Sequence, residues 1–150
     1  VPILGHFAGA APFFESAGSG MASDLACGLL PRLAGADLAL VNTPFGGYPI
    51  TVNSYLRTAQ GLGEPLGSVK PAMPIVGGGV HPGTVARYLN DLGNDIVLGV
   101  GGAIQGHPMG AEAGVRAMFQ AMEAAAAGVP LDQAEGDELH AAIARWGVLD

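Results

Sequence analysis

Four short runs of residues are apolar throughout instead of alternating with polar positions. They span residues 2–5, 37–41, 72–76 and 96–100. A strand that is covered on both faces has this pattern, whereas a half-exposed strand alternates. The runs therefore predict four buried strands of a parallel sheet.

Apolar residues at helical spacing follow each run, and we expect these stripes to be core contacts. The first consists of Leu25, Leu29 and Leu33, and Pro31 should distort this helix near its end. The later stripes are Val52, Tyr55, Leu56, Ala59 and Leu62; Val85, Tyr88, Leu89 and Leu92; Val115, Met118, Phe119 and Met122; and Leu139, Ala142, Ile143 and Trp146.

Proline and glycine mark where several of these helices begin and end. Pro82 stands at a first-turn position and Gly93 ends the same helix, while Gly128 and Gly147 end the last two. Strand, turn and helix thus repeat four times, and one further helix follows. This order predicts an α/β fold around a parallel sheet.

The chain has 150 residues, whereas a complete eightfold β/α barrel needs about 250. It begins in a strand-like run without Met, so we expect residues 1–150 to be one part of a β/α domain. Charged residues make up 13% and glycine occupies 25 positions, which is typical of buried strands joined by tight turns.

Composition also excludes two classes of partner. The longest uncharged apolar stretch with strand character, residues 96–104, is far shorter than the about 20 residues that span a bilayer. A net charge of −7 without a basic cluster disfavours nucleic acid. Cys27 is the only cysteine, so we expect a buried core thiol without disulfide, and a cytoplasmic protein.

In parallel βα folds, ligands bind at the carboxyl ends of the strands. Two neighbouring predicted strands end in glycine clusters, at Gly78 and Gly79 and at Gly101 and Gly102. Backbone N–H groups can approach a phosphate closely where no Cβ intervenes. The clusters predict one phosphate cradle, and the alternative is that the glycines only allow tight turns.

Nucleotide binding is disfavoured. The best candidate for a dinucleotide fingerprint has Ile104 where glycine or alanine is needed, and the only lysine, Lys70, is not in a phosphate-binding loop motif. Ser16 and Ser19 lack the context of a catalytic serine and are expected to lie in a loop.

Among the histidines, His6 at the end of the first, inward-facing strand could act as an acid or base, although a structural role is equally compatible with the sequence. His81 suits a helix N-cap or a loop anchor, His107 a turn, and His140 the exposed side of the last helix. Their spacing predicts no metal site built from this chain alone.

The strand ends resemble a known family. Residues 77–82 (GGGVHP) and 95–110 (DIVLGVGGAIQGHPMG) resemble the last two barrel strands of the RuBisCO large-chain superfamily, and weaker likeness extends back through residues 33–37 (LAGAD) to 5–7 (GHF). The resemblance implies that the chain is the C-terminal half, strands five to eight, of a TIM-type β/α barrel with an extra C-terminal helix.

By the same resemblance, Gly78, Gly79, Gly101 and Gly102 are the phosphate-binding glycines and His6 is an active-site histidine. Three departures set the chain apart from carboxylases. Phe7 replaces a phosphate-binding arginine, residues 42–51 contain no lysine or arginine, and Gly77 replaces a serine. A bisphosphate substrate and carboxylation are therefore not expected.

These departures are similar to those of RuBisCO-like proteins of type IV. The resemblance then implies magnesium-assisted enolisation or isomerisation of a phosphorylated keto-sugar or its methylthio analogue. It also implies a homodimer, and Mg²⁺ held by a carbamylated lysine and two carboxylates outside this chain. Alternatives are a sugar-acid phosphate decarboxylase, a true ribulose-bisphosphate carboxylase and a noncatalytic phosphate-binding half-barrel. The chain by itself is expected to be inactive, and unstable as a monomer because an opened barrel exposes strand edges.

Overall fold

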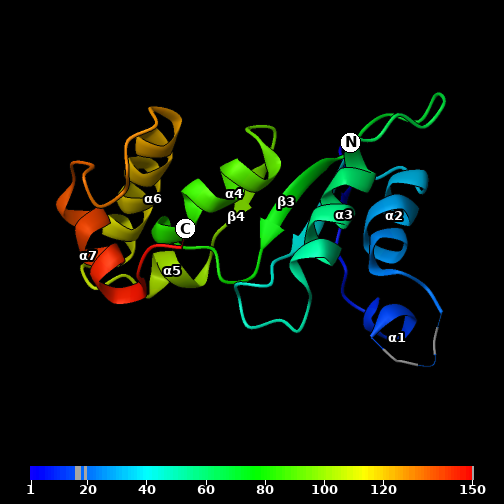
Figure 1. Ribbon diagram of the computed structural model, residues 1–150, viewed down its shortest axis with the longest axis horizontal. Coiled ribbons are helices and arrows are strands. Elements are labelled where there is room, and N and C mark those ends of the chain that lie inside the picture. The colour runs from blue at the N-terminus through cyan, green and yellow to red at the C-terminus, as the bar shows by residue number, and fades with distance from the viewer. Residues whose placement is uncertain (16–17, 19, 150) are drawn as a thin grey trace. The chain divides into compact units, whose positions relative to one another are not determined.

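The computed structural model describes residues 1–15, 18 and 20–149; Ser16 and Ser19 lie outside this range. Four strands, β1 (Leu4–Gly5), β2 (Leu38–Asn42), β3 (Met73–Gly77) and β4 (Val97–Gly99), form one sheet in the order β1-β2-β3-β4. Figure 1 labels β3 and β4. The pairs β1·β2 and β2·β3 are parallel. The predicted strands and the α/β class are confirmed.

The chain divides into two compact units. The first comprises Val1–Gly78 with Asp95–Leu98, and the second comprises Gly79–Asn94 with the residues from Gly99 onward.

The first unit contains three helical segments. They are α1 (Ala11–Phe14), a π-helical turn η1 (Leu25–Leu29) that continues into α2 (Leu30–Leu33), and α3 (Val52–Gly63). Of these, η1, α2 and α3 pack against the sheet. Thr51 caps α3, because its side chain accepts a hydrogen bond from the Ser54 N–H at 3.1 Å. Tyr55, Ala59 and Leu62 are buried, so most of the predicted core face of α3 is confirmed, whereas Val52 is 40% exposed and does not belong to it.

The predicted core stripe of the first helix is wrong. Leu25 and Leu33 are exposed, and Gly28 and Arg32 are buried instead. Pro31 has no N–H to donate to the preceding turn and clashes with its carbonyl, which widens that turn into a π-helix and rotates the buried face. The distortion expected from Pro31 is present, and its consequence is a different set of buried residues.

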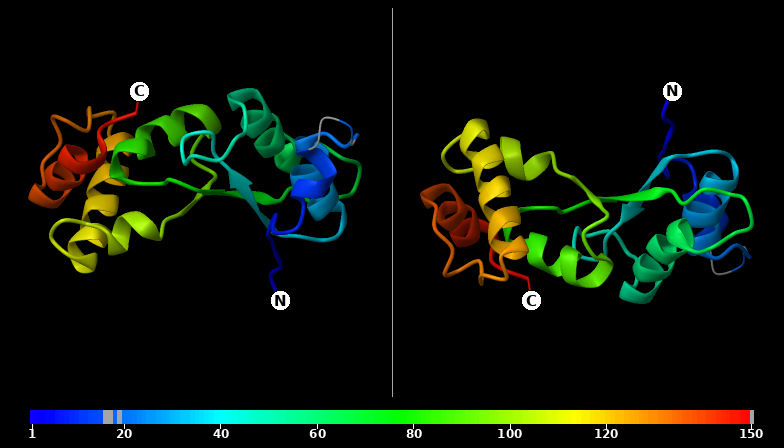
Figure 2. Two further views of the ribbon diagram at one scale, coloured as in Figure 1. Left: turned by 90° about the horizontal axis from the view of Figure 1, so that it is seen from below. Right: turned by 90° about the horizontal axis from the view of Figure 1, so that it is seen from above.

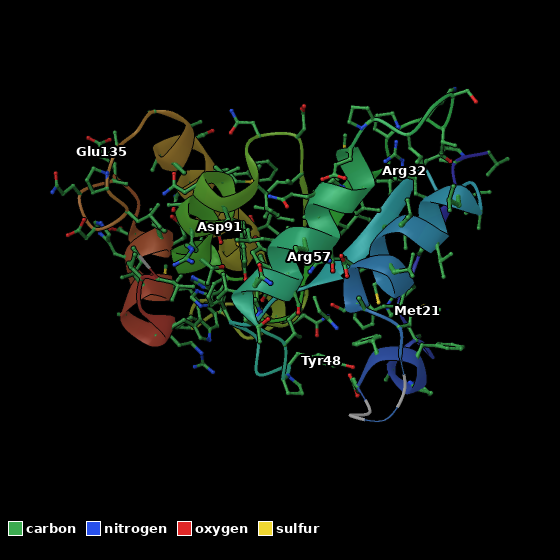
Figure 3. The ribbon with its side chains drawn as sticks, turned by 45° about the vertical axis from the view of Figure 1, so that its right-hand side comes forward. Met21, Arg32, Tyr48, Arg57, Asp91 and Glu135 are labelled. Carbon is green, nitrogen blue, oxygen red and sulfur yellow. The ribbon has the colours of Figure 1, made fainter. Side chains whose placement is uncertain are left out.

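Arg32 occupies the buried position in this helix pair, with 2% of its surface exposed. Its guanidinium donates to the main-chain carbonyl oxygens of Gly61, Glu64, Val69 and Lys70, at 2.6–3.1 Å. Figure 3 shows Arg32 on α2, beside the chain that follows α3. A single side chain therefore fixes the connection from α3 to β3.

The second unit is helical. It contains a 3-10 turn η2 (Pro82–Thr84) that leads into α4 (Val85–Leu92), a short α5 (Gly102–Gln105), α6 (Ala111–Ala126) and α7 (Asp137–Trp146). Both views of Figure 2 show α6 and α7 side by side. Tyr88 and Leu139 are fully buried, which confirms the predicted core faces of α4 and α7, and Gly93 and Gly147 end these helices at positive φ.

The predicted core stripe of α6 is wrong in three of its four members. Val115, Phe119 and Met122 are exposed, Phe119 to 58%, and only Met118 is buried. The buried face is made mainly of small residues: Ala113, Gly114, Ala117, Ala121 and Ala124. Small side chains let neighbouring segments approach closely: an ideal Cβ on Gly114 would lie 2.5 Å from the Ile104 carbonyl oxygen.

Coverage of the sheet differs from the prediction. β2 alternates between buried and half-buried residues, and Leu4 in β1 is 52% exposed. β1 and β4 are the two edge strands, and Val97 in β4 is 37% exposed, so the expectation of burial on both faces is wrong for both strands. No helix within the described part of the chain is long and apolar enough to cross a membrane.

Candidate functional site

His6 directly follows β1 and is exposed, not enclosed by apolar neighbours as expected, because β1 is a two-residue edge strand. Its Nδ1 accepts a hydrogen bond from the Ala8 N–H at 2.9 Å. A nitrogen that accepts carries no proton, so this contact selects the neutral tautomer with the proton on Nε2. His6 therefore offers a hydrogen-bond donor at its Nε2.

An aromatic pair lies beside His6. The Phe7 ring centroid is 4.7 Å from that of His6 and 6.1 Å from that of Tyr48. The Tyr48 hydroxyl donates to the Glu15 carboxylate, and this bond, followed by burial, raises the pKa of Tyr48. Tyr48 (labelled in Figure 3) belongs to residues 42–51, which carry no lysine or arginine. The neighbours of His6 are thus aromatic side chains, whereas binding of a second phosphate would need a cationic one.

Thr43 anchors the glycine turn that follows β3. Its Oγ1 donates to the Gly78 carbonyl oxygen at 2.8 Å, and the side chain is fully buried. The register pairs Asn42 with Gly77, the last residues of β2 and β3, so the two strands end side by side. Sequence reasoning missed Thr43, although its place directly after a strand was a usable signal.

Gly77 has a packing reason to be glycine. An ideal Cβ there would lie 3.0 Å from Leu40 Cδ1, so any side chain would require Leu40 to shift. A serine at position 77 would therefore need a small shift of the Leu40 side chain.

The four predicted phosphate-binding glycines fall into two groups. Gly78 and Gly79 have φ of +91° and +75°, a conformation that favours glycine whatever surrounds it. Gly101 has a φ of −131°, Gly102 begins α5, and an ideal Cβ on either would meet no atom within 4 Å. The tight-turn explanation accounts for the first pair and leaves the second pair unexplained.

Gly78 belongs to the first compact unit, and Gly79, Gly101 and Gly102 belong to the second. All four are exposed. The common cradle stays a prediction.

His81 is the N-cap of η2, as predicted, and its N–H donates to Thr84 Oγ1 at 3.1 Å. Within the described residues its buried Nδ1 has no hydrogen-bond partner, and burial lowers the pKa of His81. His107 is buried in the predicted turn, where its Nδ1 accepts from the Met109 N–H at 3.1 Å. His140 is exposed on α7, as expected.

Cys27 is half-buried, so the prediction of a fully buried thiol is wrong: the adjacent Gly28 takes the buried position. Burial, and after it the Glu15 carboxylate, raises the pKa of Cys27, which keeps the thiol protonated. Cys27 is therefore a poor nucleophile.

Within the described range, no three or more His, Cys, Asp or Glu side chains gather in an arrangement that could hold a metal ion. Two cavities of about 470 and 340 Å³ lie along α3 in the first unit, and Arg57 lines both. Neither is lined by His6 or by any of the four glycines. The predicted site residues thus lie on open surface of their own units.

Comparison with known proteins matches residues 51–146 to the family model described as ribulose bisphosphate carboxylase large chain, catalytic domain. The chain is 39% identical to 2,3-diketo-5-methylthiopentyl-1-phosphate enolase of Exiguobacterium sibiricum over 99% of its own length. It spans 38% of the length of that relative.

The chain is also similar to solved structures of a RuBisCO-like protein and of a RuBisCO. A RuBisCO-like protein from Alicyclobacillus acidocaldarius superposes with a TM-score of 0.90 at 40% identity, over 98% of this chain and 37% of that one. A dimeric archaeal RuBisCO from Hyperthermus butylicus superposes with a TM-score of 0.82 at 34% identity, over 99% and 38% respectively.

Proposed function

Because the chain belongs to the family of the ribulose bisphosphate carboxylase large-chain catalytic domain, we propose that the whole protein is a RuBisCO-like enolase. Its substrate would be a phosphorylated keto-sugar or the methylthio analogue 2,3-diketo-5-methylthiopentyl 1-phosphate. In this proposal residues 1–150 supply strands five to eight of the barrel. Relatives named as enolases of the methylthio compound, at 39% and 37% identity, support the choice of reaction.

The observation that carries the proposal is the pair Gly101 and Gly102. Neither the backbone conformation of Gly101 nor packing at either position requires glycine, and the two glycines leave the backbone open to close approach by a group from outside the chain. A phosphate group fits, because its oxygens accept hydrogen bonds from main-chain N–H groups that no Cβ screens. In the proposal, Gly78 and Gly79 contribute to the same cradle.

The surroundings of His6 favour an enolase over a carboxylase. Phe7 and Tyr48 place aromatic rings where a second phosphate would need a cation. A thioether makes favourable contacts with aromatic rings, which suits a substrate with one phosphate and a methylthio end. Gly77 offers no hydroxyl to a substrate, and Leu40 lies close beside it.

In the proposal, His6 donates a hydrogen bond to the carbonyl oxygen of the substrate. Enolisation removes a proton from the carbon next to a carbonyl and leaves negative charge on the carbonyl oxygen. With Nδ1 engaged by the Ala8 N–H, the Nε2–H of His6 can donate a hydrogen bond to that oxygen and stabilise the developing charge.

Magnesium, a homodimer and a cytoplasmic location remain proposals for the whole protein. The described residues offer no donor set for Mg²⁺, so its ligands would come from outside this chain, and the role of His6 does not depend on it. The dimeric archaeal RuBisCO among the similar structures supports the homodimer. We expect the 150-residue chain alone to be inactive.

The test uses the complete protein and a substrate with exchangeable C–H bonds next to its two carbonyl groups. We expect the protein to exchange one of these protons for deuterium from D₂O when given 2,3-diketo-5-methylthiopentyl 1-phosphate, followed by NMR. Ribulose bisphosphate with labelled carbon dioxide should yield no fixed label, and release of carbon dioxide from a sugar-acid phosphate would identify the decarboxylase instead. Absence of exchange with every phosphorylated ketone tried would refute the enolase.

A further inference from the structure

Trp146, the last residue of α7, contacts both glycine-bearing segments of the second unit. Its ring stacks on that of His81, with centroids 5.9 Å apart and an interplanar angle of 30°. His81 is two residues beyond Gly79. On another side, Trp146 Cζ2 lies 3.9 Å from an ideal Cβ on Gly106, which directly follows the helix that begins at Gly102.

The main chain beyond α7 is fixed to the same place. The Leu149 N–H donates to the Gly83 carbonyl oxygen at 2.9 Å. An ideal Cβ on Gly83 would lie 1.9 Å from the Gly147 carbonyl oxygen, so only glycine permits this approach. The turn η2, which follows the Gly79 turn, is therefore held by backbone contact as well as by the indole.

The segment after α5 is held by α7 in the same way. The His107 ring is 6.2 Å from that of Trp146, and its Nε2 lies 2.9 Å from the Glu138 carbonyl oxygen in α7. Because Nδ1 of His107 accepts from Met109, Nε2 carries the proton and donates to Glu138. Both segments that contact Trp146, η2 and the chain after α5, are thus also held by hydrogen bonds to α7 or to the residues that follow it.

We propose that Trp146 is a positioning residue for phosphate binding, which fixes the Gly79 turn relative to the first turn of α5. This inference rests on the proposed phosphate-binding role of Gly79, Gly101 and Gly102. Two sets of amides can bind one anion only at a fixed separation, and hydrogen bonds weaken steeply when their geometry is lost. The indole sets that separation without touching the substrate.

The test compares Trp146→Phe and Trp146→Leu in the complete enzyme, with inorganic phosphate as a competitive inhibitor. The Leu variant should raise both KM and the inhibition constant of phosphate about tenfold and leave kcat within about twofold, because uniform binding is lost. The Phe variant keeps the stack on His81 but does not reach Gly106, so we expect a rise of about threefold. His140→Ala, on the exposed side of the same helix, should change neither constant.

Thermal melting shows which variants are folded. If the Leu variant does not fold, the Phe variant decides: KM and phosphate inhibition equal to those of the wild type would overturn the role of Trp146, and so would a fall in kcat at constant KM. A wild-type enzyme that phosphate does not inhibit, with Gly102→Ala equally unaffected, would overturn the phosphate cradle and this inference together. A wild type that phosphate inhibits, with unresponsive Trp146 variants, would overturn this inference alone.

Discussion

The Arg32 guanidinium donates to the Glu64 carbonyl oxygen at 2.6 Å, from a side chain that is almost entirely buried. Three further carbonyls accept from it, that of Gly61 in the last turn of α3 and those of Val69 and Lys70 in the connection to β3. The planar fork of arginine suits this arrangement, because it presents five N–H donors in fixed directions. Arg32 is thus the link between α2 and the chain that leads into β3.

Arg32→Lys should destabilise the protein by about 3 kcal/mol, because an ammonium cannot reach all four carbonyls and leaves buried acceptors unpaired. Urea unfolding of the complete protein measures the change. Arg57→Lys is the matched control, since the Arg57 side chain is 56% exposed and its ion pair with Asp24 should contribute less than about 1 kcal/mol. Equal losses in the two variants would show that the carbonyl contacts of Arg32 do not matter.

Gly102→Ala should separate binding from stability. A methyl group there meets no atom of the chain, and alanine is a better helix former than glycine, so stability should hold or rise by up to about 1 kcal/mol. The same methyl group would keep a phosphate from the backbone amide, and we expect KM for the phosphorylated substrate to rise at least about tenfold.

Gly63→Ala is the control for that change, because Gly63 is also helical and an ideal Cβ on it also meets no atom. It should give a similar stability change and an unaltered KM. An unaltered KM in Gly102→Ala as well would remove the phosphate assignment.

His81 should make stability depend on pH. Burial lowers its folded-state pKa below the ordinary value of about 6.5, so the unfolded chain binds a proton more readily. The resulting loss of folding stability is absent above about pH 6.5 and grows as the pH falls through that value towards the folded-state pKa. Stability should therefore decrease on acidification over this range.

His81→Phe isolates this contribution, because a phenyl ring can still stack on Trp146 but cannot titrate. Urea titrations at about pH 7.5 and 5.5 measure the unfolding free energy of both proteins. Subtracting the two values at each pH cancels the contribution of all titrating groups that the proteins share. We expect the wild type to lose more stability on acidification. Parallel pH dependences would contradict the burial of the imidazole.

The sequence by itself determined the strands and most helix ends, and the places where a ligand would bind stay predictions. Buried strands must be apolar, so they can be predicted from the sequence. Pro82 begins a helix, and Gly93 and Gly147 end helices, through local backbone geometry alone, so these positions could also be predicted. The glycines at strand ends were identifiable for the same reason. His6 was placed correctly at the end of β1, while its exposure was not.

Only the tertiary structure decided which faces of the η1–α2 segment and of α6 are buried. Arg32 instead of Leu33, and Ala117 instead of Phe119, face the interior, because close approach of neighbouring segments selects small or fully hydrogen-bonded side chains over large apolar ones. The partners of Arg32 and Trp146 lie far along the chain from them. Contacts of that kind depend on how elements meet in space, and spacing along one sequence does not encode them.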